Sequence, residues 1–147
     1  MNTPMSALLE RKGSTVYSVT PTATIAEAVN EMNRHRIGAI VVLENGRLVG
    51  IFTERDVLLR VVGAAVDTRS VRVTDVMTST LITVTPETTI EEAMNIFAEK
   101  RCRHLPVIAN ERLVGLVSIG DISRWVADSH RAEAEHLKNY LAGGFAV

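Results

Sequence analysis

The sequence has little of what would direct it to a membrane or to an oxidising compartment. Its 147 residues include one cysteine, Cys102, so neither an internal disulfide nor a cysteine-based metal site is available to the chain on its own. A single cysteine fits a reducing, cytoplasmic setting. No apolar run approaches the roughly 18 residues of a membrane span, and the N-terminus lacks the apolar core of a signal peptide.

The sequence also lacks an excess of charge of either sign. The formal net charge is −1, so there is no basic surplus of the kind that a nucleic-acid partner requires. The histidines do not have the spacing of metal ligands on one helix; they are His35, His104, His130 and His136. With 46% hydrophobic and 22% charged residues, the chain has the composition of a folded protein, and we expect no metal site in it.

Motifs of nucleotide-using enzymes are absent as well. The sequence contains no Walker loop and no Gly-x-Gly-x-x-Gly, the motifs with which many enzymes hold phosphate groups. The hydroxyl and carboxylate clusters described below have no histidine in the same pattern that could act as a base. We therefore predict that the chain has no catalytic activity.

The chain does contain an internal repeat. A shift of 65 positions aligns residues 19–62 with residues 84–127 without a gap, and 17 of the 44 pairs are identical, where average composition gives about 3 by chance. The longest identical stretch is Arg-Leu-Val-Gly, at residues 47–50 and 112–115. The repeat predicts two copies of one supersecondary unit.

Each copy has the pattern of a β-α-β-β-α unit. In copy one, we expect a strand at 16–19, a helix after Thr24, strands at 37–43 and 47–53, and a helix at 54–62. Thr24 and Glu27 form a capping-box pattern at the start of the first helix. The two central strands are so apolar that we expect them to be buried on both faces, and the Asn-Gly pair between them favours a hairpin.

Copy two repeats these signals. Its helix is expected to begin after Thr89, its strands to occupy residues 104–108 and 112–118, and its last helix to occupy residues 119–127. Around the copies, we expect a short helix at 6–12 ended by Gly13 and one helical turn at 73–77. A tail helix at 130–141, ended by Ala-Gly-Gly, would pack on the core or on another subunit. The predicted organisation is an N-terminal segment (1–15), unit 1 (16–66), linker and unit 2 (67–128), and a tail (129–147).

Each copy closes on a hydroxyl residue followed three positions later by an aspartate. Residues 50–56 read Gly-Ile-Phe-Thr-Glu-Arg-Asp, and residues 115–121 read Gly-Leu-Val-Ser-Ile-Gly-Asp. At a strand-to-helix junction, the free N–H groups and the helix dipole favour an anion. Asp56 and Asp121 could accept hydrogen bonds from both hydroxyls of a ribose, while Thr53 and Ser118 could donate to a phosphate. The same pattern is an ordinary helix cap; its repetition favours ligand contact, and the two roles can coexist.

Several cationic side chains lie at positions where an anion would stabilise them. Arg103 and His104 stand at the start of an apolar strand, where unpaired charge is costly, and a phosphate explains them better than a structural ion pair. Arg55 lies in the first turn of a helix, so an acidic side chain or a phosphate is expected nearby. Lys12 is either a phosphate contact or a solvated lysine, and Met77 reads more simply as a packing residue.

Taken together, residues 16–127 resemble a pair of cystathionine-β-synthase (CBS) domains, also called a Bateman module. The resemblance rests on the two Gly-apolar-apolar-(Thr/Ser)-x-x-Asp endings. It also rests on Val-x-Asp-Val-Met-Thr at 73–78 and Arg-His-Leu-Pro-Val at 103–107, both typical of the family. The chain resembles the small stand-alone bacterial and archaeal members, which carry no catalytic domain.

The resemblance implies an α/β (α+β) fold in which two β-α-β-β-α units pack through their sheets with pseudo-twofold symmetry. It implies two clefts for adenosine-containing ligands, namely AMP, ADP, ATP, S-adenosylmethionine or NAD(H), although some members bind other ligands or none. It also implies a homodimer that forms a four-unit disk, and a regulated protein partner that the sequence does not identify.

The same resemblance implies which residues line the clefts. Cleft one would contain Lys12, Tyr17, Ile37, Ala39, Arg103, His104, Ser118 and Asp121. Cleft two would contain Gly38, Ala39, Thr53, Arg55, Asp56, Met77, Ile82 and Cys102. Because the repeat pairs Arg55 with Gly120 and pairs Arg103 and His104 with Gly38 and Ala39, we expect the two clefts to differ in ligand preference or affinity.

We therefore expect a non-catalytic adenine-nucleotide sensor whose ligand biases the arrangement of subunits. The alternative is a constitutive interaction and dimerisation module whose clefts stay empty.

Overall fold

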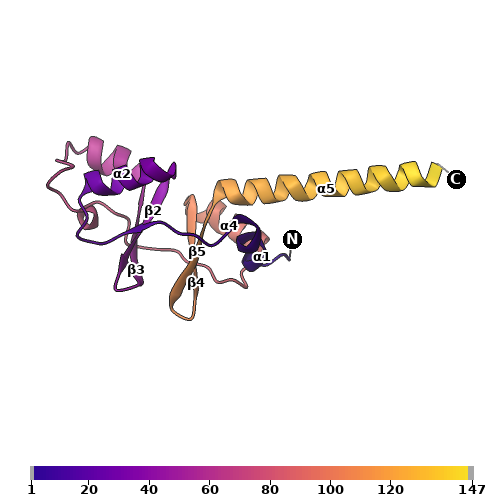
Figure 1. Ribbon diagram of the computed structural model, residues 1–147, viewed down its shortest axis with the longest axis horizontal. Coiled ribbons are helices and arrows are strands. Elements are labelled where there is room, and N and C mark those ends of the chain that lie inside the picture. The colour runs from indigo at the N-terminus through magenta and orange to yellow at the C-terminus, as the bar shows by residue number, and fades with distance from the viewer. Residues whose placement is uncertain (1, 146–147) are drawn as a thin grey trace.

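The computed structural model describes residues 2–145 and shows two lobes side by side, with one long helix extending from the second (Figure 1). The first lobe, unit 1, is made of β1 (Ser18–Val19), α2 (Ile25–His35), β2 (Ala39–Glu44), β3 (Arg47–Thr53), α3 (Glu54–Asp56) and the π-helical segment η1 (Val57–Val62). The second, unit 2, is made of α4 (Ile90–Lys100), β4 (His104–Ala109), β5 (Arg112–Ser118) and α5 (Ile119–Phe145). Helix α1 (Met5–Lys12) comes before both units, and the 3₁₀ turn η2 (Val73–Asp75) lies between them.

The two predicted hairpins are confirmed, and β3 and β5 have the predicted bounds. β2 pairs with β3, and β4 with β5, in antiparallel ladders. Both turn residues of each hairpin have positive φ, as two-residue hairpin loops of type I′ require: Asn45 (52°) and Gly46 (80°), then Asn110 (51°) and Glu111 (64°). Glu111 adopts this conformation at a steric cost that Gly46 avoids.

The first strand of unit 2 is the clearest departure from the prediction. In unit 1, β1 pairs in parallel with β2, and the Val41 N–H donates to the Tyr17 carbonyl at 3.4 Å. In unit 2, the equivalent strand is reduced to one bridge between Val84 and Val107. The repeat places Pro106 where unit 1 has Val41, and proline has no N–H to donate. The predicted five-element unit is therefore complete only in copy one.

The helix starts and ends follow the predicted signals. The Thr24 hydroxyl accepts from the Glu27 N–H at 3.2 Å, and Thr89 accepts from Glu92 at 3.1 Å. Helix α2 ends at Arg36 and α4 at Arg101, both in the left-handed conformation with φ of 54° and 53°. These caps hold the two central helices in equivalent positions in the two units.

The last helices differ from the prediction in two ways. Residues 57–62 form a π-helix rather than an α-helix. In unit 2, the predicted helix at 119–127 and the predicted tail helix are one continuous helix of 27 residues, and it passes through Gly143 and Gly144 instead of ending before them. Residues 128–139 contain neither glycine nor proline, so nothing in this stretch stops the helix. The predicted tail also included residues 146–147, which lie outside the described range. Among the described residues, no helix is long and apolar enough to cross a membrane.

Each unit is completed by a segment that precedes the other unit in the chain. Met5 and Leu8 of α1 are buried in the core of unit 2, beside Ile90, Leu105 and Val117. Conversely, Val73 and Val76 are buried in the core of unit 1, beside Ile25, Ile40 and Phe52. The 65-residue repeat relates Leu8 to Val73, so the exchange is symmetric. It is visible in Figure 1, where α1 lies against the second lobe.

The exchanged segments pass over the two glycines of the repeated Arg-Leu-Val-Gly stretch. A Cβ built on Gly50 would lie 2.3 Å from the sulfur of Met77, and one on Gly115 would lie 2.7 Å from Leu9 Cδ2. Only glycine permits so close an approach at each position. Strands β3 and β5 also contact each other, so these two strands lie where the units meet.

Candidate functional site

The two repeated hydroxyl–aspartate pairs form the same hydrogen-bonded structure. At the first, the Asp56 carboxylate accepts from the Thr53 N–H (3.0 Å) and the Asp56 N–H donates to the Thr53 hydroxyl (3.2 Å). At the second, Asp121 accepts from the Ser118 N–H (2.8 Å) and its own N–H donates to the Ser118 hydroxyl (3.1 Å). Both carboxylates are buried, with 5% and 8% of their residues' surface exposed. Each aspartate thus completes the cap of the helix that begins where the strand ends.

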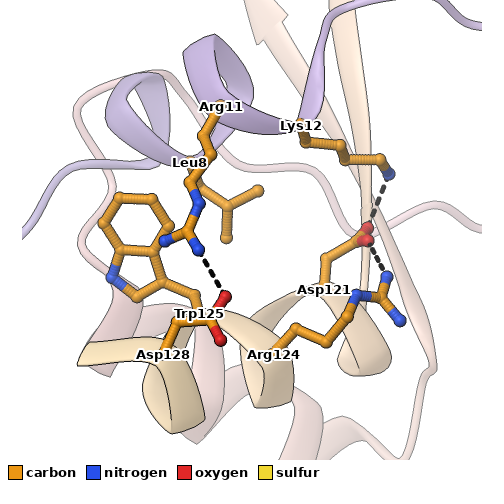
Figure 2. Close-up of a pocket in the computed structure, with 7 residues that line it drawn as sticks. All are labelled: Leu8, Arg11, Lys12, Asp121, Arg124, Trp125 and Asp128. Atoms are coloured by element: carbon orange, nitrogen blue, oxygen red, sulfur yellow. Dashed lines mark hydrogen bonds and ion pairs between the residues drawn. The ribbon is translucent and has the colours of Figure 1, made fainter. Parts of the chain in front are cut away.

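Around Asp121, hereafter the Asp121 site, two cations converge on the carboxylate (Figure 2). Lys12 Nζ lies 2.5 Å from Oδ2, and Arg124 donates to Oδ1 at 2.6 Å. Lys12 also donates to the Leu116 carbonyl at 2.5 Å. Burial raises the pKa of Asp121, but the hydrogen bonds from Lys12 and Ser118 outweigh it and hold the pKa below its usual value. The carboxylate is therefore ionised at neutral pH.

A hollow of about 190 Å³ adjoins this ion cluster. It is lined by Leu8, Arg11, Lys12, Asp121, Arg124, Trp125 and Asp128. Arg11 pairs with Asp128, and its guanidinium carbon lies 5.2 Å from the ring centroid of Trp125, which is cation–π distance. Three cationic side chains and one indole ring thus border a single hollow between α1 and α5.

Around Asp56, hereafter the Asp56 site, the equivalent partners are mostly neutral. The Thr78 hydroxyl donates to Asp56 Oδ1 at 3.0 Å, and the Thr53 hydroxyl donates to Oδ2 at 3.2 Å. Arg60 Nε is 3.7 Å from Oδ1, but its guanidinium donates to the Met77 carbonyl at 2.9 Å. Thr78 therefore takes the position at Asp56 that Lys12 takes at Asp121, again from the segment that precedes the other unit.

A family model for the CBS domain matches residues 13–63 and 73–128. The chain is a CBS-domain protein. It is 39% identical to the mitochondrial CBS domain-containing protein CBSX3 of Arabidopsis thaliana, over 98% of this chain and 74% of that protein. It is 35% identical to the CBS domain-containing protein YhcV of Bacillus subtilis, over 81% and 84% of the two chains. Among solved structures, a CBS-domain containing protein from Agrobacterium tumefaciens superposes with a TM-score of 0.76 at 38% identity, covering 83% of this chain and 98% of that one.

CBS domains generally bind adenosine-containing ligands or mediate regulation and interaction. In this CBS pair, the polar residues predicted for cleft one that meet at one place are Lys12, Ser118 and Asp121. His104 lies beside them, since it pairs with Ser118 across the β4–β5 ladder. Burial lowers the pKa of His104, Lys12 lowers it further, and the charges of Asp121 and Glu54 oppose these effects. The imidazole is therefore neutral at pH 7.

The predicted arginines lie at the same junctions but are exposed. Arg55 follows Glu54 at the start of α3, and Arg103 precedes β4. Within residues 2–145, neither side chain forms an ion pair. The Glu54 carboxylate instead comes within 3.0 Å of the position a Cβ would take on Gly38. Both arginines are thus available to an anion.

The apolar residues predicted for the clefts have packing roles in this structure. Ile37 and Met77 pack against the core of unit 1, and Ile82 and Cys102 pack against the core of unit 2. Burial raises the pKa of the Cys102 thiol, which keeps it protonated. Ala39 is buried at the start of β2, opposite Thr53 in the ladder.

Tyr17 stacks on His35 of α2 with ring centroids 3.6 Å apart and an interplanar angle of 11°. It remains 40% exposed.

Sequence reasoning missed seven residues that contact the two aspartates or line the hollow beside Asp121: Leu8, Arg11, Arg60, Thr78, Arg124, Trp125 and Asp128. Helical spacing alone could have found two of them, because Arg60 and Arg124 follow their aspartates by four and three positions. Thr78 directly follows Met77, and Arg11 directly precedes Lys12. The other residues from α1, Leu8 and Arg11, could be found only by knowing that α1 packs on unit 2.

Proposed function

We propose that this CBS-domain protein is a non-catalytic sensor that binds an adenine nucleotide at the Asp121 site and at the Asp56 site. The ligand classes proposed are AMP, ADP, ATP and NAD(H), with S-adenosylmethionine as a further adenosine-containing candidate. The proposal includes the predicted cleft residues named above, with Asp121 and Asp56 as the two ribose ligands.

One observation carries the proposal: an ionised, buried carboxylate at a strand-to-helix turn is held by a lysine that lies more than a hundred positions away in the sequence. A carboxylate accepts both hydroxyl protons of a ribose diol. When the ribose binds the carboxylate, Lys12 and Arg124 are released beside the start of α5. The helix dipole and the free N–H groups there favour phosphate oxygens. The arrangement supplies separate partners for the sugar and for the phosphate of one nucleotide.

The small volume of the hollow supports a site that widens when a ligand binds. A cavity of about 190 Å³ is below the roughly 300–1,000 Å³ of typical ligand pockets. Lys12 and Arg124 are the most exposed groups that hold Asp121, with 36% and 72% of their side chains accessible. A nucleotide would displace both from the carboxylate and recruit them to its phosphate, which moves α1 against α5.

A ligand changes the arrangement of subunits only if it binds two arrangements with different affinity. We propose that α1 provides this difference, because it both lines the Asp121 site and completes the core of unit 2. The proposed assembly is a homodimer forming a four-unit disk in the cytoplasm, together with a regulated protein partner.

Titration calorimetry and thermal shift with AMP, ADP, ATP, NADH, S-adenosylmethionine and adenosine test the proposal. A binding ligand raises the melting temperature, because it stabilises the folded state. The expected result is binding of at least one nucleotide, lost when Asp56 and Asp121 are both replaced by alanine in a protein that still folds. Unchanged affinity in the double variant would refute the proposal.

A second candidate function is a constitutive interaction module with empty clefts. It is favoured by the observation that the described residues include no buried side-chain polar atom without a hydrogen-bond partner, so both aspartates are satisfied without a ligand. Mass spectrometry under native conditions separates the two functions. A co-purifying adenylate supports the sensor, and a dimer free of ligand supports the interaction module.

A further inference from the structure

The outer half of α5 carries an apolar stripe that nothing in the described chain covers. Leu137 is 58% exposed and Leu141 is 48% exposed, and Figure 1 shows this half of the helix extending away from both units. Ala134 and His130 continue the stripe toward the body of the protein at spacings of three and four residues, which keeps them on one face of the helix.

The stripe runs without interruption into an apolar groove between α4 and α5. The groove has a volume of about 490 Å³ and is lined by Met94, Phe97, Ala98, Ile119, Ile122, Ser123, Val126 and Ala127. Ser123 and Ala127 fall on the same helical spacing as His130, Ala134, Leu137 and Leu141. From Ile119, where the groove begins, to Leu141, the groove lining on α5 and the stripe together span about 33 Å at 1.5 Å per residue.

The spacing is that of a coiled-coil heptad, in which positions a and d form the contact between helices. Ala127, Ala134 and Leu141 occupy position a, and Ser123, His130 and Leu137 occupy position d. The small residues at Ser123, Ala127 and Ala134 allow two helix backbones to approach closely. The stripe can thus pair with a helix that has the same seven-residue repeat.

The flanking charges select the partner and its direction. Glu133 at position g and Lys138 at position e are both exposed. In a parallel pair of identical helices, g of one helix faces the following e of the other, so Glu133 meets Lys138 of the second copy, twice by symmetry. An antiparallel pair that keeps Ala134 against His130 instead brings Glu133 against Glu133 and Arg131 against Arg131. Like charges in those positions repel.

We propose that α5 pairs in parallel with α5 of a second copy of this chain, along the stripe from Ser123 to Leu141. Each residue of the stripe then lies against its own counterpart, as a twofold axis parallel to the helix requires. The two grooves face each other at one end of the contact, and the two pairs of leucines close the other end. About two heptads beyond the body of the protein would pair weakly alone, so the groove is a necessary part of the interface.

Cysteine cross-linking of the full chain tests the geometry, in a background where Cys102 is replaced by serine. Leu137→Cys should give disulfide-linked dimers in most of the protein after mild oxidation, because the two sulfurs meet across the axis. Asn139→Cys is the matched control: it lies two residues further on, about 200° around the helix, and should cross-link only at background level. Equal cross-linking of the two variants, or none in either, would overturn the proposal.

The direction of the helices is tested in the same background. Leu137→Cys combined with Ala127→Cys adds a cross-link between positions 127 and 137 only in an antiparallel pair. Peptide mapping that finds the 127–137 link in place of the 137–137 link overturns the parallel arrangement.

A charge reversal supplies an independent test by sedimentation equilibrium. Lys138→Glu places two repelling pairs at the interface and should raise the dimer dissociation constant roughly 10-fold. The double change Glu133→Lys with Lys138→Glu restores the attraction and should return the constant to within about threefold. A dissociation constant that is the same in all three proteins would refute the role of these charges. None of these measurements uses a nucleotide, so they can fail while nucleotide binding persists.

Discussion

The Asp121 site and the Asp56 site are built on the same backbone frame but surrounded by different chemistry. Both have a capping hydroxyl, a buried aspartate and a partner from the segment that precedes the other unit. At Asp121, that partner is a lysine, with an arginine on the second oxygen. At Asp56, it is a threonine hydroxyl, and the arginine is 3.7 Å away.

The two copies of the repeat thus share the geometry of the hydroxyl–aspartate pair, while the charges around it differ at positions outside that motif. A ligand at the Asp121 site gains contacts with two cations, Lys12 and Arg124, which it displaces from the carboxylate. A ligand at the Asp56 site gains only the exposed Arg55 and the weakly held Arg60. We therefore expect the Asp121 site to prefer ligands with more phosphate charge.

The largest expected effect comes from removing one aspartate at a time. Asp121→Ala should abolish the phosphate-dependent binding event, with a loss of affinity of about 100-fold or more, because it removes a charged ribose ligand. Asp56→Ala should remove the other event and leave the first within about threefold. Calorimetric titration with AMP and with ATP measures both. Two identical, independent sites in the unmodified protein would contradict the predicted difference.

The two close-approach glycines should differ in stability. Gly115→Ala drives a methyl group into Leu9, which is buried in the core of unit 2, and overpacking of this kind costs about 1–3 kcal/mol. Gly50→Ala meets the end of Met77, a flexible side chain that is only partly buried, and should cost less. Urea denaturation measures both variants. Met77→Ala should relieve the cost of Gly50→Ala, and the absence of any relief would count against the contact.

Replacing the side chain that holds each aspartate tests the difference in charge between the two sites. Lys12→Met should lower affinity for nucleotides about 10-fold, or about 1.4 kcal/mol, while adenosine affinity stays unchanged. It should also raise the pKa of Asp121, because the hydrogen bond and charge of Lys12 hold that pKa down. NMR titration of the carboxyl reports the change. Thr78→Val is the matched neutral variant and should alter nucleotide and adenosine binding equally.

The smallest expected effect is in the pH dependence of folding. Because the pKa of His104 is lowered in the folded protein, the unfolded chain binds the extra proton below about pH 6.5. Stability should therefore fall as pH decreases from about 6.5 toward the folded pKa. His104→Gln should flatten this part of the curve, measured by urea denaturation at several pH values. An unchanged slope would show that another group titrates there.

Local signals in the sequence were enough for most of the backbone. The Asn-Gly and Asn-Glu turns defined the hairpins, and Thr24 and Thr89 marked the helix starts. The repeat also identified Asp56 and Asp121 as equivalent positions. These features depend on residues a few positions apart, where spacing and propensity decide the structure.

The features that could not be predicted depend on contacts between distant segments. Nothing local in residues 5–12 indicates that α1 packs on unit 2, and so the pairing of Lys12 with Asp121 was an implication of family resemblance rather than of spacing. The missing strand of unit 2 was in principle predictable from Pro106, since the equivalent Val41 donates the hydrogen bond that proline cannot make. The π-helical geometry of residues 57–62 has no signal that we can identify.

The exchange of segments between the two cores has a consequence for how the chain is made. The buried neighbours of Met5 include Val117 and Ile122, which are synthesised more than a hundred positions after it. Unit 1 can close once residues 73–76 have emerged, while α1 must remain unburied until residues 117–122 have emerged as well. Contacts between such distant residues slow folding, and exposed apolar surface invites aggregation. Helix α1 is therefore translated before unit 1 but buried after it, and its apolar face stays exposed during that interval.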